Sequence, residues 1–250
     1  MTLPVRPADL GSGVRAGFTS RAGGVSVGPW SGLNLGLRVG DDPEQVRRNR
    51  DLLEEWIGAR VVFPSQVHGT HVLVVGGPAS GAVPEAAPGA GEPADAVVSG
   101  AGGPAAGVLV ADCVPVLLAD PQAGVVAAAH AGWRGLLAGV LQACVAAMVA
   151  RGAATDRVRA ALGPAALPCC YQVGADLREQ AAALLPATWA TTRSGAPSLD
   201  LRAGCRSALE AAGVGRVELV GGCTIEDEGL YSYRRQQVTG RFAGVVRMLG

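Results

Sequence analysis

The sequence predicts a mixed α/β fold in a single domain spanning residues 1–250. The chain has 250 residues and is 49% hydrophobic, which is enough to bury one sizeable core without disulfides. Short apolar runs rich in Val and Ala alternate with longer segments of helical length. Such runs are typical of strands in a sheet that is covered on both faces.

The first helix is expected at residues 43–57. Asp42 is suited to cap its N-terminus, Pro43 to occupy its first turn, and Gly58 to end it. Further helices are expected at 136–150, 175–185 and 199–212. Strands are expected at 61–63, 72–75, 96–98, 107–111, 114–119, 125–129, 158–162, 217–220 and 244–248.

Residues 76–94 interrupt this alternation. Nine of these nineteen residues are Gly or Pro, and Ala fills most of the rest, a composition that cannot build a packed element. We therefore expect a flexible surface loop between two strands.

Composition excludes several partners. The 21 basic and 21 acidic residues cancel, so no net field favours nucleic acid or an anionic membrane. The longest apolar stretches are shorter than the roughly 20 residues that a membrane span needs, and residues 1–13 do not resemble a secretion signal. We expect a cytoplasmic protein with no nucleic-acid or membrane partner, whose six cysteines are free thiols.

Every basic residue is Arg, because the chain contains no Lys. This excludes Schiff-base catalysis and the phosphate-binding lysine of a P-loop. Arginine side chains are therefore the only cationic ones available for phosphate or carboxylate.

Histidine is scarce, which narrows the candidate site. The chain has three histidines, and His130 follows Cys113 by seventeen residues. One thiolate and two imidazoles can hold zinc with a fourth position open to water or substrate. His68 and His71 compete for the third place, and we choose His68 because Gln-Val-His-Gly offers a turn beside it. Asp112, next to Cys113 in an apolar run, is expected to have a functional role.

A series of motifs resembles one known family in both content and order. The matching segments are Ser20–Ser26, Leu33–Gly36, Val39–Asp42, Asn49–Arg50, Gln66–Gly69, Ala94–Ala96, Ala111–Pro115, His130–Gly135, Cys170–Gly174, Cys223–Thr224, Tyr231–Arg235 and Thr239–Arg241. The chain resembles the bacterial YfiH proteins, also called the multicopper polyphenol oxidase or laccase-domain family. Members of that family are described as purine nucleoside phosphorylases with adenosine deaminase activity.

The resemblance covers about residues 17–247 and implies a fold. Its members have two mixed sheets packed together with helices outside, an α/β/β/α arrangement. It also implies a metal, usually zinc, at His68, Cys113 and His130. Two departures are present: Gln172 stands where Glu is common, and residues 225–227 lack a further Cys that is common there.

The resemblance implies phosphorolysis of adenosine, inosine and methylthioadenosine, and deamination of adenosine to inosine. Its substrates would be a purine nucleoside and phosphate, bound by a monomer or a homodimer. Cys113, His130 and Asp112 are the catalytic candidates. The substrate-binding candidates are Arg21, Arg134 and Arg234 for phosphate, Trp133 for stacking on the purine, and Asn34 and Gln66 from matching motifs.

Deamination fits the expected centre better than oxidase chemistry does. A multicopper centre needs on the order of ten histidine ligands, and the chain has three, so copper in this site would be adventitious. Zinc with an open position lowers the pKa of bound water to about 7, and Asp112 is a candidate proton carrier. The usual deaminase signature with Pro-Cys-x-x-Cys is absent.

Two other hypotheses remain open. Cys113 can act as a nucleophile with His130 or His68 as its base, in a hydrolase of amide bonds or cell-wall precursors. The same three residues can also form a non-catalytic structural zinc site, with Cys223 as the fourth ligand.

Overall fold

Two antiparallel strands at the centre of the fold show how its layers arise. All residues of β7 (Val114–Asp120) and β8 (Val125–Ala131) are buried. Alternate side chains point to opposite faces of a strand. Val114, Val116 and Leu118 accordingly pack in a core with helices, whereas Leu117 and Ala119 pack in a second core against another sheet. This computed structural model describes residues 3–76 and 92–249.

The larger sheet contains six strands in the order β12-β9-β7-β8-β5-β4. The pairs β4–β5 and β9–β12 are parallel and the others antiparallel, so the sheet is mixed. Its remaining strands are β4 (Val72–Val75), β5 (Ala96–Gly100), β9 (Arg159–Leu162) and β12 (Arg216–Leu219).

The smaller sheet contains five strands in the order β1-β2-β13-β6-β3. Only β3 and β6 run parallel, and β13 pairs with β2 on one side and β6 on the other. Its strands are β1 (Arg6–Pro7), β2 (Val14–Phe18), β3 (Val61–Val62), β6 (Ala105–Val110) and β13 (Phe242–Met248). Phe18 of β2 is fully buried in the core between the two sheets.

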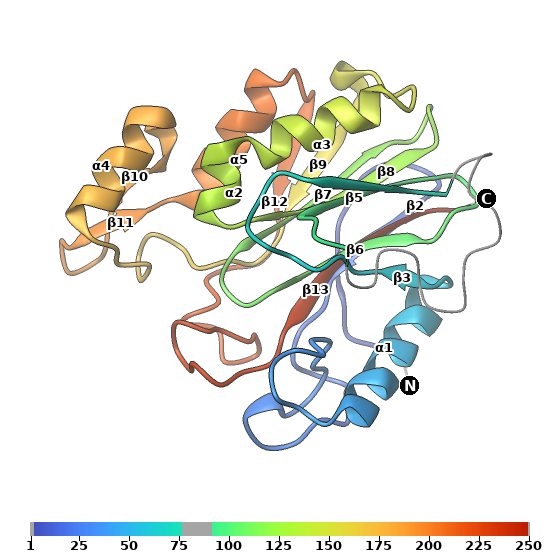
Figure 1. Cartoon of the computed structure of the whole chain (residues 1–250), viewed down its shortest axis with the longest axis horizontal. Coiled ribbons are helices and arrows are strands. Elements are labelled where there is room, and N and C mark those ends of the chain that lie inside the picture. The colour runs from blue at the N-terminus through green and yellow to red at the C-terminus, as the bar shows by residue number, and fades with distance from the viewer. Residues whose placement is uncertain (1–2, 77–91, 250) are drawn as a thin grey trace.

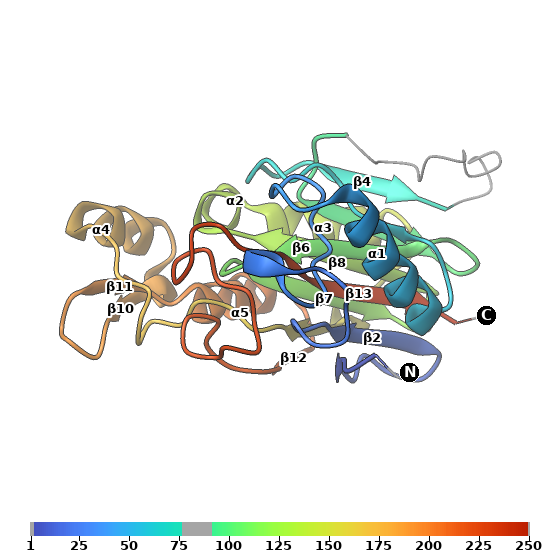
Figure 2. The ribbon, with the colours of Figure 1, turned by 90° about the horizontal axis from the view of Figure 1, so that it is seen from below.

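Helices cover the outer face of each sheet (Figure 1). The larger sheet is covered by α2 (Trp133–Ala138), α3 (Val140–Val149) and α5 (Leu201–Ala211). The smaller sheet is covered by α1 (Pro43–Ile57), whose Leu53 and Ile57 are fully buried. The predicted α/β/β/α arrangement of two mixed sheets with helices outside is confirmed, and Figure 2 shows it from a second direction.

A small arm extends beyond the sheets. It consists of α4 (Ala175–Leu184) and the hairpin of β10 (Trp189–Thr191) and β11 (Pro197–Leu199), on the left of Figure 1.

In residues 3–76 and 92–249, no helix combines the length and the apolar character needed to cross a membrane.

The helix boundaries largely follow the sequence prediction. The Asp42 side chain accepts a hydrogen bond from the Glu44 backbone N–H at 2.9 Å, and Gly58 ends α1 with φ of 76°. The predicted helix 136–150 is wrong in one respect: it is two helices, α2 and α3. Gly139 separates them with φ of 97°, a left-handed conformation that ends a helix and that glycine adopts readily.

Other differences concern strands. The sequence pattern does not predict β1, β2, β10 and β11, and β6 begins two residues before the predicted strand at 107. The expected flexible loop at 76–94 falls mostly outside the described residues. Its last part is ordered by pairing, because Ser65 forms an isolated parallel bridge with Pro93.

Candidate metal centre and cavity

Three predicted ligands from separate parts of the chain meet at one edge of the sheets. His68 lies in the loop between β3 and β4, Cys113 in the turn between β6 and β7, and His130 in β8. One ligand atom from each lies within 4.8 Å of the other two. The two imidazole rings are 4.7 Å apart between centroids, at an interplanar angle of 70°. We call this set the ligand triad. His71, the competing histidine, is exposed and is not part of it.

Strand register explains the convergence. Val114 pairs with Ala131 and Pro115 with His130, so the turn holding Cys113 comes beside the end of β8. On the other side of β8, Ala96 pairs with Ala129, which brings Asp95 next to His130. The sheet therefore fixes two of the three ligands without any metal.

Asp95 orients both histidines. Its fully buried carboxylate accepts hydrogen bonds from the backbone N–H groups of Val67, His68 and Gly69 at 3.1, 3.0 and 2.7 Å. The same carboxylate is 2.8 Å from His130 Nδ1. When Nδ1 donates to a carboxylate, Nε2 is left as the metal-binding atom, an arrangement common around zinc.

Electrostatics in the metal-free site favour a protonated His130. Burial lowers its pKa, but the neighbouring Cys113 and the hydrogen bond to Asp95 outweigh burial and raise the pKa to about 9. For Asp95, burial raises the pKa, while His130 and the Gly69 N–H lower it to below its usual range. Burial and the neighbouring His130 lower the pKa of His68. A cation at the ligand triad therefore competes with a proton on His130.

The residues present fit a small soft-to-borderline cation. Nitrogen and sulfur donors in a three-ligand set are typical of catalytic zinc sites. Space is also reserved for the ligands: a Cβ on Gly132 would lie 2.5 Å from His68 Nδ1 and 3.1 Å from Cys113 Sγ. Gly132 has φ of −76°, so glycine is needed here for space and not for conformation.

Asp112 holds the turn that carries Cys113. It has φ of 107°, and its carboxylate oxygens accept hydrogen bonds from the Thr224 hydroxyl and the Arg234 backbone N–H, both at 2.6 Å. Its own carbonyl accepts from the Ala166 N–H at 2.8 Å. These contacts tie the Cys113 turn to two other loops.

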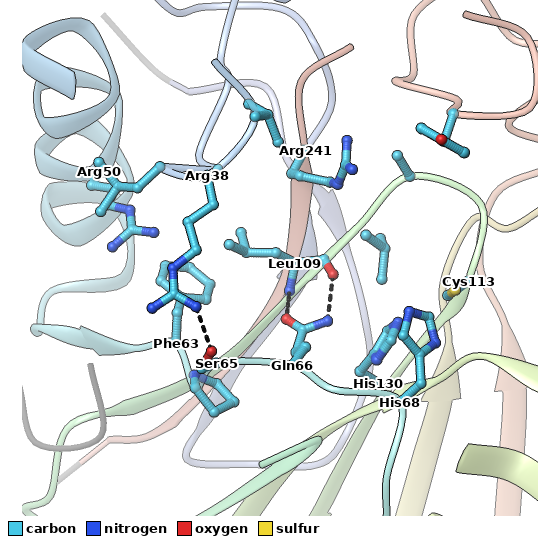
Figure 3. A pocket seen from close by; sticks show the side chains of 17 residues that line it. Arg38, Arg50, Phe63, Ser65, Gln66, His68, Leu109, Cys113, His130 and Arg241 are labelled. Carbon is cyan, nitrogen blue, oxygen red and sulfur yellow. Dashed lines mark hydrogen bonds between the residues drawn. The ribbon is translucent and has the colours of Figure 1, made fainter. Parts of the chain in front are cut away.

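A cavity of about 740 Å³ opens beside the ligand triad (Figure 3). In Figure 3 the three ligands lie at one end of it and Arg38 and Arg50 at the other, with Gln66 and Leu109 between. Seventeen residues line it: Gly36, Leu37, Arg38, Val39, Arg50, Phe63, Pro64, Ser65, Gln66, His68, Leu109, Val110, Ala111, Cys113, His130, Tyr233 and Arg241.

Of the six predicted substrate-binding residues, the cavity lining includes Gln66. Its side-chain amide is paired with the backbone of Leu109 in β6, donating to the carbonyl and accepting from the N–H at 2.8 Å each. Asn34 is fully buried, and its amide contacts Asp41 and the backbone of Gly36 and Arg241.

The other predicted substrate-binding residues are Arg21, Arg134, Arg234 and Trp133. Each of the three arginines lies over an aromatic ring. The guanidinium carbon is 5.1 Å from the ring centroid for Arg21 over Tyr231, 4.2 Å for Arg134 over Trp133, and 4.9 Å for Arg234 over Tyr171. Arg234 also donates to the carbonyl of Gln172, the position where the family commonly has Glu. None of the four lines the cavity formed by the described residues.

No role is predicted from the sequence for Asp95 or for the cavity arginines Arg38, Arg50 and Arg241. Asp95 has a detectable signal, since it is a lone carboxylate within the apolar run at 94–98 that would be costly to bury unpaired. Arg50 and Arg241 lie in the matching segments Asn49–Arg50 and Thr239–Arg241, but no local pattern marks them or Arg38 as neighbours of the ligand triad. Only tertiary packing brings them together.

Cys223 belongs elsewhere. Among the described residues it is grouped with Cys169, Cys170 and Glu226 and not with the ligand triad. A closed structural zinc site at His68, Cys113 and His130 would therefore lack Cys223 as its fourth ligand.

Comparisons with known proteins agree with this fold. The sequence matches the family described as multi-copper polyphenol oxidoreductase laccase over residues 15–249. It is 45% identical to a purine nucleoside phosphorylase of Streptomyces griseus, over 98% of this chain and 99% of the relative. It is 48% identical to a purine nucleoside phosphorylase of Streptomyces coelicolor, over 95% of this chain and 97% of the relative.

Solved structures show the same fold. A Neisseria meningitidis protein superposes with a TM-score of 0.86 at 37% identity, covering all of both chains. YlmD from Geobacillus stearothermophilus superposes with a TM-score of 0.84 at 32% identity, covering 97% of this chain and 94% of that one. The chain therefore belongs to the multi-copper polyphenol oxidoreductase laccase family, which includes the YfiH proteins.

Proposed function

We propose that the protein is a zinc-dependent purine nucleoside phosphorylase. The observation that carries this proposal is one cavity with the ligand triad at one end and three arginines in its wall. Its volume of about 740 Å³ lies in the range of small-molecule sites. Relatives with 45% and 48% identity that are named purine nucleoside phosphorylases support the same substrate class.

Phosphate binding falls to Arg38, Arg50 and Arg241. Within the part of the chain that the structure describes, none of the three forms an ion pair with a carboxylate. Arg50 is held by two hydrogen bonds to the Leu35 carbonyl, and Arg241 by bonds to the carbonyls of Thr239 and Gly240. A guanidinium that is fixed by carbonyls keeps its charge available for an anion.

The purine is expected against the aromatic and apolar part of the same wall. Phe63 is buried with the Arg50 guanidinium over its ring, whereas Tyr233 is exposed near Arg241, so Tyr233 is the ring open to a base. Aromatic faces of this kind bind a flat base by stacking. Phosphate and nucleoside would then lie in one cavity, as the attack of phosphate on the ribose requires.

In phosphorolysis a phosphate oxygen attacks the ribose anomeric carbon and the bond from that carbon to the purine nitrogen breaks. The products are ribose 1-phosphate and the free base, which takes up a proton. The arginines orient the phosphate, and the cavity wall orients the nucleoside. His68, Cys113 and His130 would hold the zinc ion, whose Lewis acidity would activate water or stabilise developing negative charge.

We also propose adenosine deamination at the same site. In that reaction water adds to the amino-bearing purine carbon and ammonia leaves. The donor set of two nitrogens and one sulfur, the type found in catalytic zinc sites, supports it. Asp112 remains the predicted proton carrier, and its bonds to Thr224 and Arg234 equally suit a positioning role.

The test is turnover of adenosine, inosine and methylthioadenosine with and without phosphate. The wild-type protein should release free base only when phosphate is present. It should convert adenosine to inosine even when phosphate is absent. Cys113→Ala should lose both activities, whereas Cys144→Ala, which removes a buried thiol elsewhere, should keep them. Unchanged product formation by Cys113→Ala would contradict the proposal.

Thiol alkylation separates this proposal from the Cys–His hydrolase. A zinc-bound Cys113 should resist alkylation until a chelator is added, whereas a metal-free nucleophile should react at once. Copper loading tests the oxidase name: three histidines in the whole chain cannot supply a four-copper centre, so any oxidase activity should be weak.

A further inference from the structure

A second cluster of metal-ligating side chains lies outside the cavity. Cys169 and Cys170 follow β9, Cys223 follows β12, and Glu226 lies three residues beyond Cys223. One ligand atom from each of the four lies within 4.8 Å of the other three. We call this set the cysteine cluster.

We propose that the cysteine cluster is a structural zinc site, with three thiolates and the Glu226 carboxylate as its ligands. In a tetrahedral site with zinc–sulfur bonds of about 2.3 Å, neighbouring sulfurs are roughly 3.8 Å apart. The four ligand atoms lie within 4.8 Å of one another, and the Cys169 and Cys170 sulfurs, 3.0 Å apart, would have to separate by roughly 1 Å or slightly less to bind the ion. Structural zinc sites close all four positions with protein side chains, and this cluster offers four.

The donor chemistry selects the type of ion. Three sulfurs and one oxygen favour zinc over magnesium or calcium, which bind through oxygen. The thiols are available, since all six cysteines of the chain are free. Cys223 is buried at 5% exposure, Cys169 and Cys170 are half-buried and Glu226 is exposed, so the ion would lie near the surface with the carboxylate on its solvent side.

The contacts around these ligands suit a negatively charged site. The Leu167 backbone N–H points to Cys223 Sγ at 3.5 Å. Arg193 pairs with Glu226 through both carboxylate oxygens, and its backbone N–H donates to the Cys169 carbonyl at 3.2 Å. Three thiolates, a carboxylate and a divalent cation carry two net negative charges, and Arg193 offsets one of them. Such outer contacts orient ligands around metals.

The cysteine cluster adjoins the proposed active site through one residue. Thr224 follows Cys223 and donates its hydroxyl hydrogen bond to Asp112, which precedes Cys113. The loops that carry the cysteine cluster also meet through an isolated bridge between Ala165 and Cys223. An ion there would fix the support on which the Cys113 turn rests. Its role is positional, because no residue of the cluster lines the cavity formed by the described residues.

Metal content of the full-length protein tests this inference. Protein that is prepared with zinc and reductant and then desalted should contain two zinc ions per chain, measured by inductively coupled plasma mass spectrometry. Cys170→Ser and Cys113→Ala should each retain one, and the double variant none. Cys144→Ala, which removes a thiol from the helix core, should retain two.

Cobalt gives a second readout that does not depend on activity. In the Cys113→Ala background, cobalt should show strong thiolate-to-metal charge-transfer absorption, which the further Cys170→Ser change removes. One zinc per wild-type chain that Cys113→Ala loses, or a cobalt spectrum without that absorption, would overturn the site at the cysteine cluster while leaving the proposed phosphorylase untouched. If Cys170→Ser does not fold, the wild-type stoichiometry and the Cys113→Ala spectrum still decide.

Discussion

At the scale of single residues, Asp95 has the largest predicted effect on the ligand triad. Asp95→Asn would remove the charge that accepts from His130 Nδ1 and from three backbone N–H groups. Loss of such an orienting carboxylate typically lowers metal affinity by about 10- to 100-fold. We expect that loss in a zinc competition titration.

The control is Asp120→Asn. Asp120 is equally buried and pairs with Arg157 at 2.8 Å, away from the ligand triad. It should lower stability without changing zinc affinity. Equal zinc affinities for the two variants would contradict the role given to Asp95.

The raised pKa of His130 predicts how zinc affinity depends on pH. With a pKa of about 9, the metal-free imidazole is protonated at pH 7, and zinc must displace that proton. Affinity should therefore rise about tenfold per pH unit between about pH 7 and 9 and level off above. A titration in the Cys170→Ser background isolates the ligand triad. Constant affinity across this range would show that His130 is neutral in the metal-free protein.

The same pKa predicts the stability of the metal-free protein. A group with a raised pKa stabilises the fold fully below its unfolded value, and loses that contribution as pH rises through its folded value. For His130 the stabilisation should fade between about pH 6.5 and 9. Denaturation midpoints with chelator present measure it, and the zinc-bound protein should not show this loss.

Gly132→Ala tests the space reserved for the ligands. Its Cβ would approach His68 Nδ1 to 2.5 Å, so the imidazole must move and zinc binding should fall while the fold persists. Gly174→Ala is the matched control, because Gly174 also precedes a helix with a similar backbone and has nothing within 4 Å of its Cβ position. Equal zinc content in the two variants would show that the space beside His68 does not require glycine at position 132.

At the scale of elements, Gly139 separates α2 from α3 at a φ of 97°. A Cβ there meets only the Gln142 side chain, at 3.6 Å or beyond, so Gly139→Ala should cost conformational strain alone. We expect about 1–2 kcal/mol lower free energy of unfolding by chemical denaturation. Gly174→Ala, with negative φ, should be near neutral. No difference between the two would mean that the break is not set by the glycine conformation.

Elements with a strong local signal are predictable from the sequence. α1 has an N-cap, a first-turn proline and a terminal glycine, and these signals predict its range to the residue. β7 and β8 are apolar on both faces, as strands between two layers must be. By contrast, β2 contains Arg15 and Gly17 and draws its stability from pairing with β13, more than 220 residues away. Pairing at that separation leaves no trace in a local pattern.

At the scale of the whole molecule, the candidate site is predictable as far as its chemistry depends on rare residue types. Three histidines and one cysteine beside an aspartate narrow the candidates to Cys113, His130 and one of His68 and His71, and the turn beside His68 together with the family resemblance favours His68. Arginine is common in this chain, so scarcity cannot select Arg38, Arg50 and Arg241. Motif position does not select them either, because Arg21, Arg134 and Arg234 lie in matching motifs as Arg50 and Arg241 do, and none of those three lines the cavity formed by the described residues. The cavity wall is a product of both sheets and α1, and only the assembled fold reveals it.

Because the members of the ligand triad come from three distant segments, zinc should stabilise the whole fold. An ion that binds only the native state adds about 2.7 kcal/mol at a concentration 100 times its dissociation constant. Chelator should lower the denaturation midpoint of wild type, and Cys113→Ala should show a smaller shift, limited to the cysteine cluster. Identical shifts in the two proteins would argue against zinc at the ligand triad.

Two non-glycine residues among those described have positive φ, His68 at 60° and Asp112 at 107°. Both lie in or beside the ligand triad, where neighbouring contacts impose backbone conformations that an isolated chain avoids. Asp112→Gly would relax the less common of the two, but would also remove the anchor to Thr224 and Arg234. Substitutions at this turn selected for higher stability should therefore lower activity, because the same backbone torsion angles that strain the folded state also position Cys113.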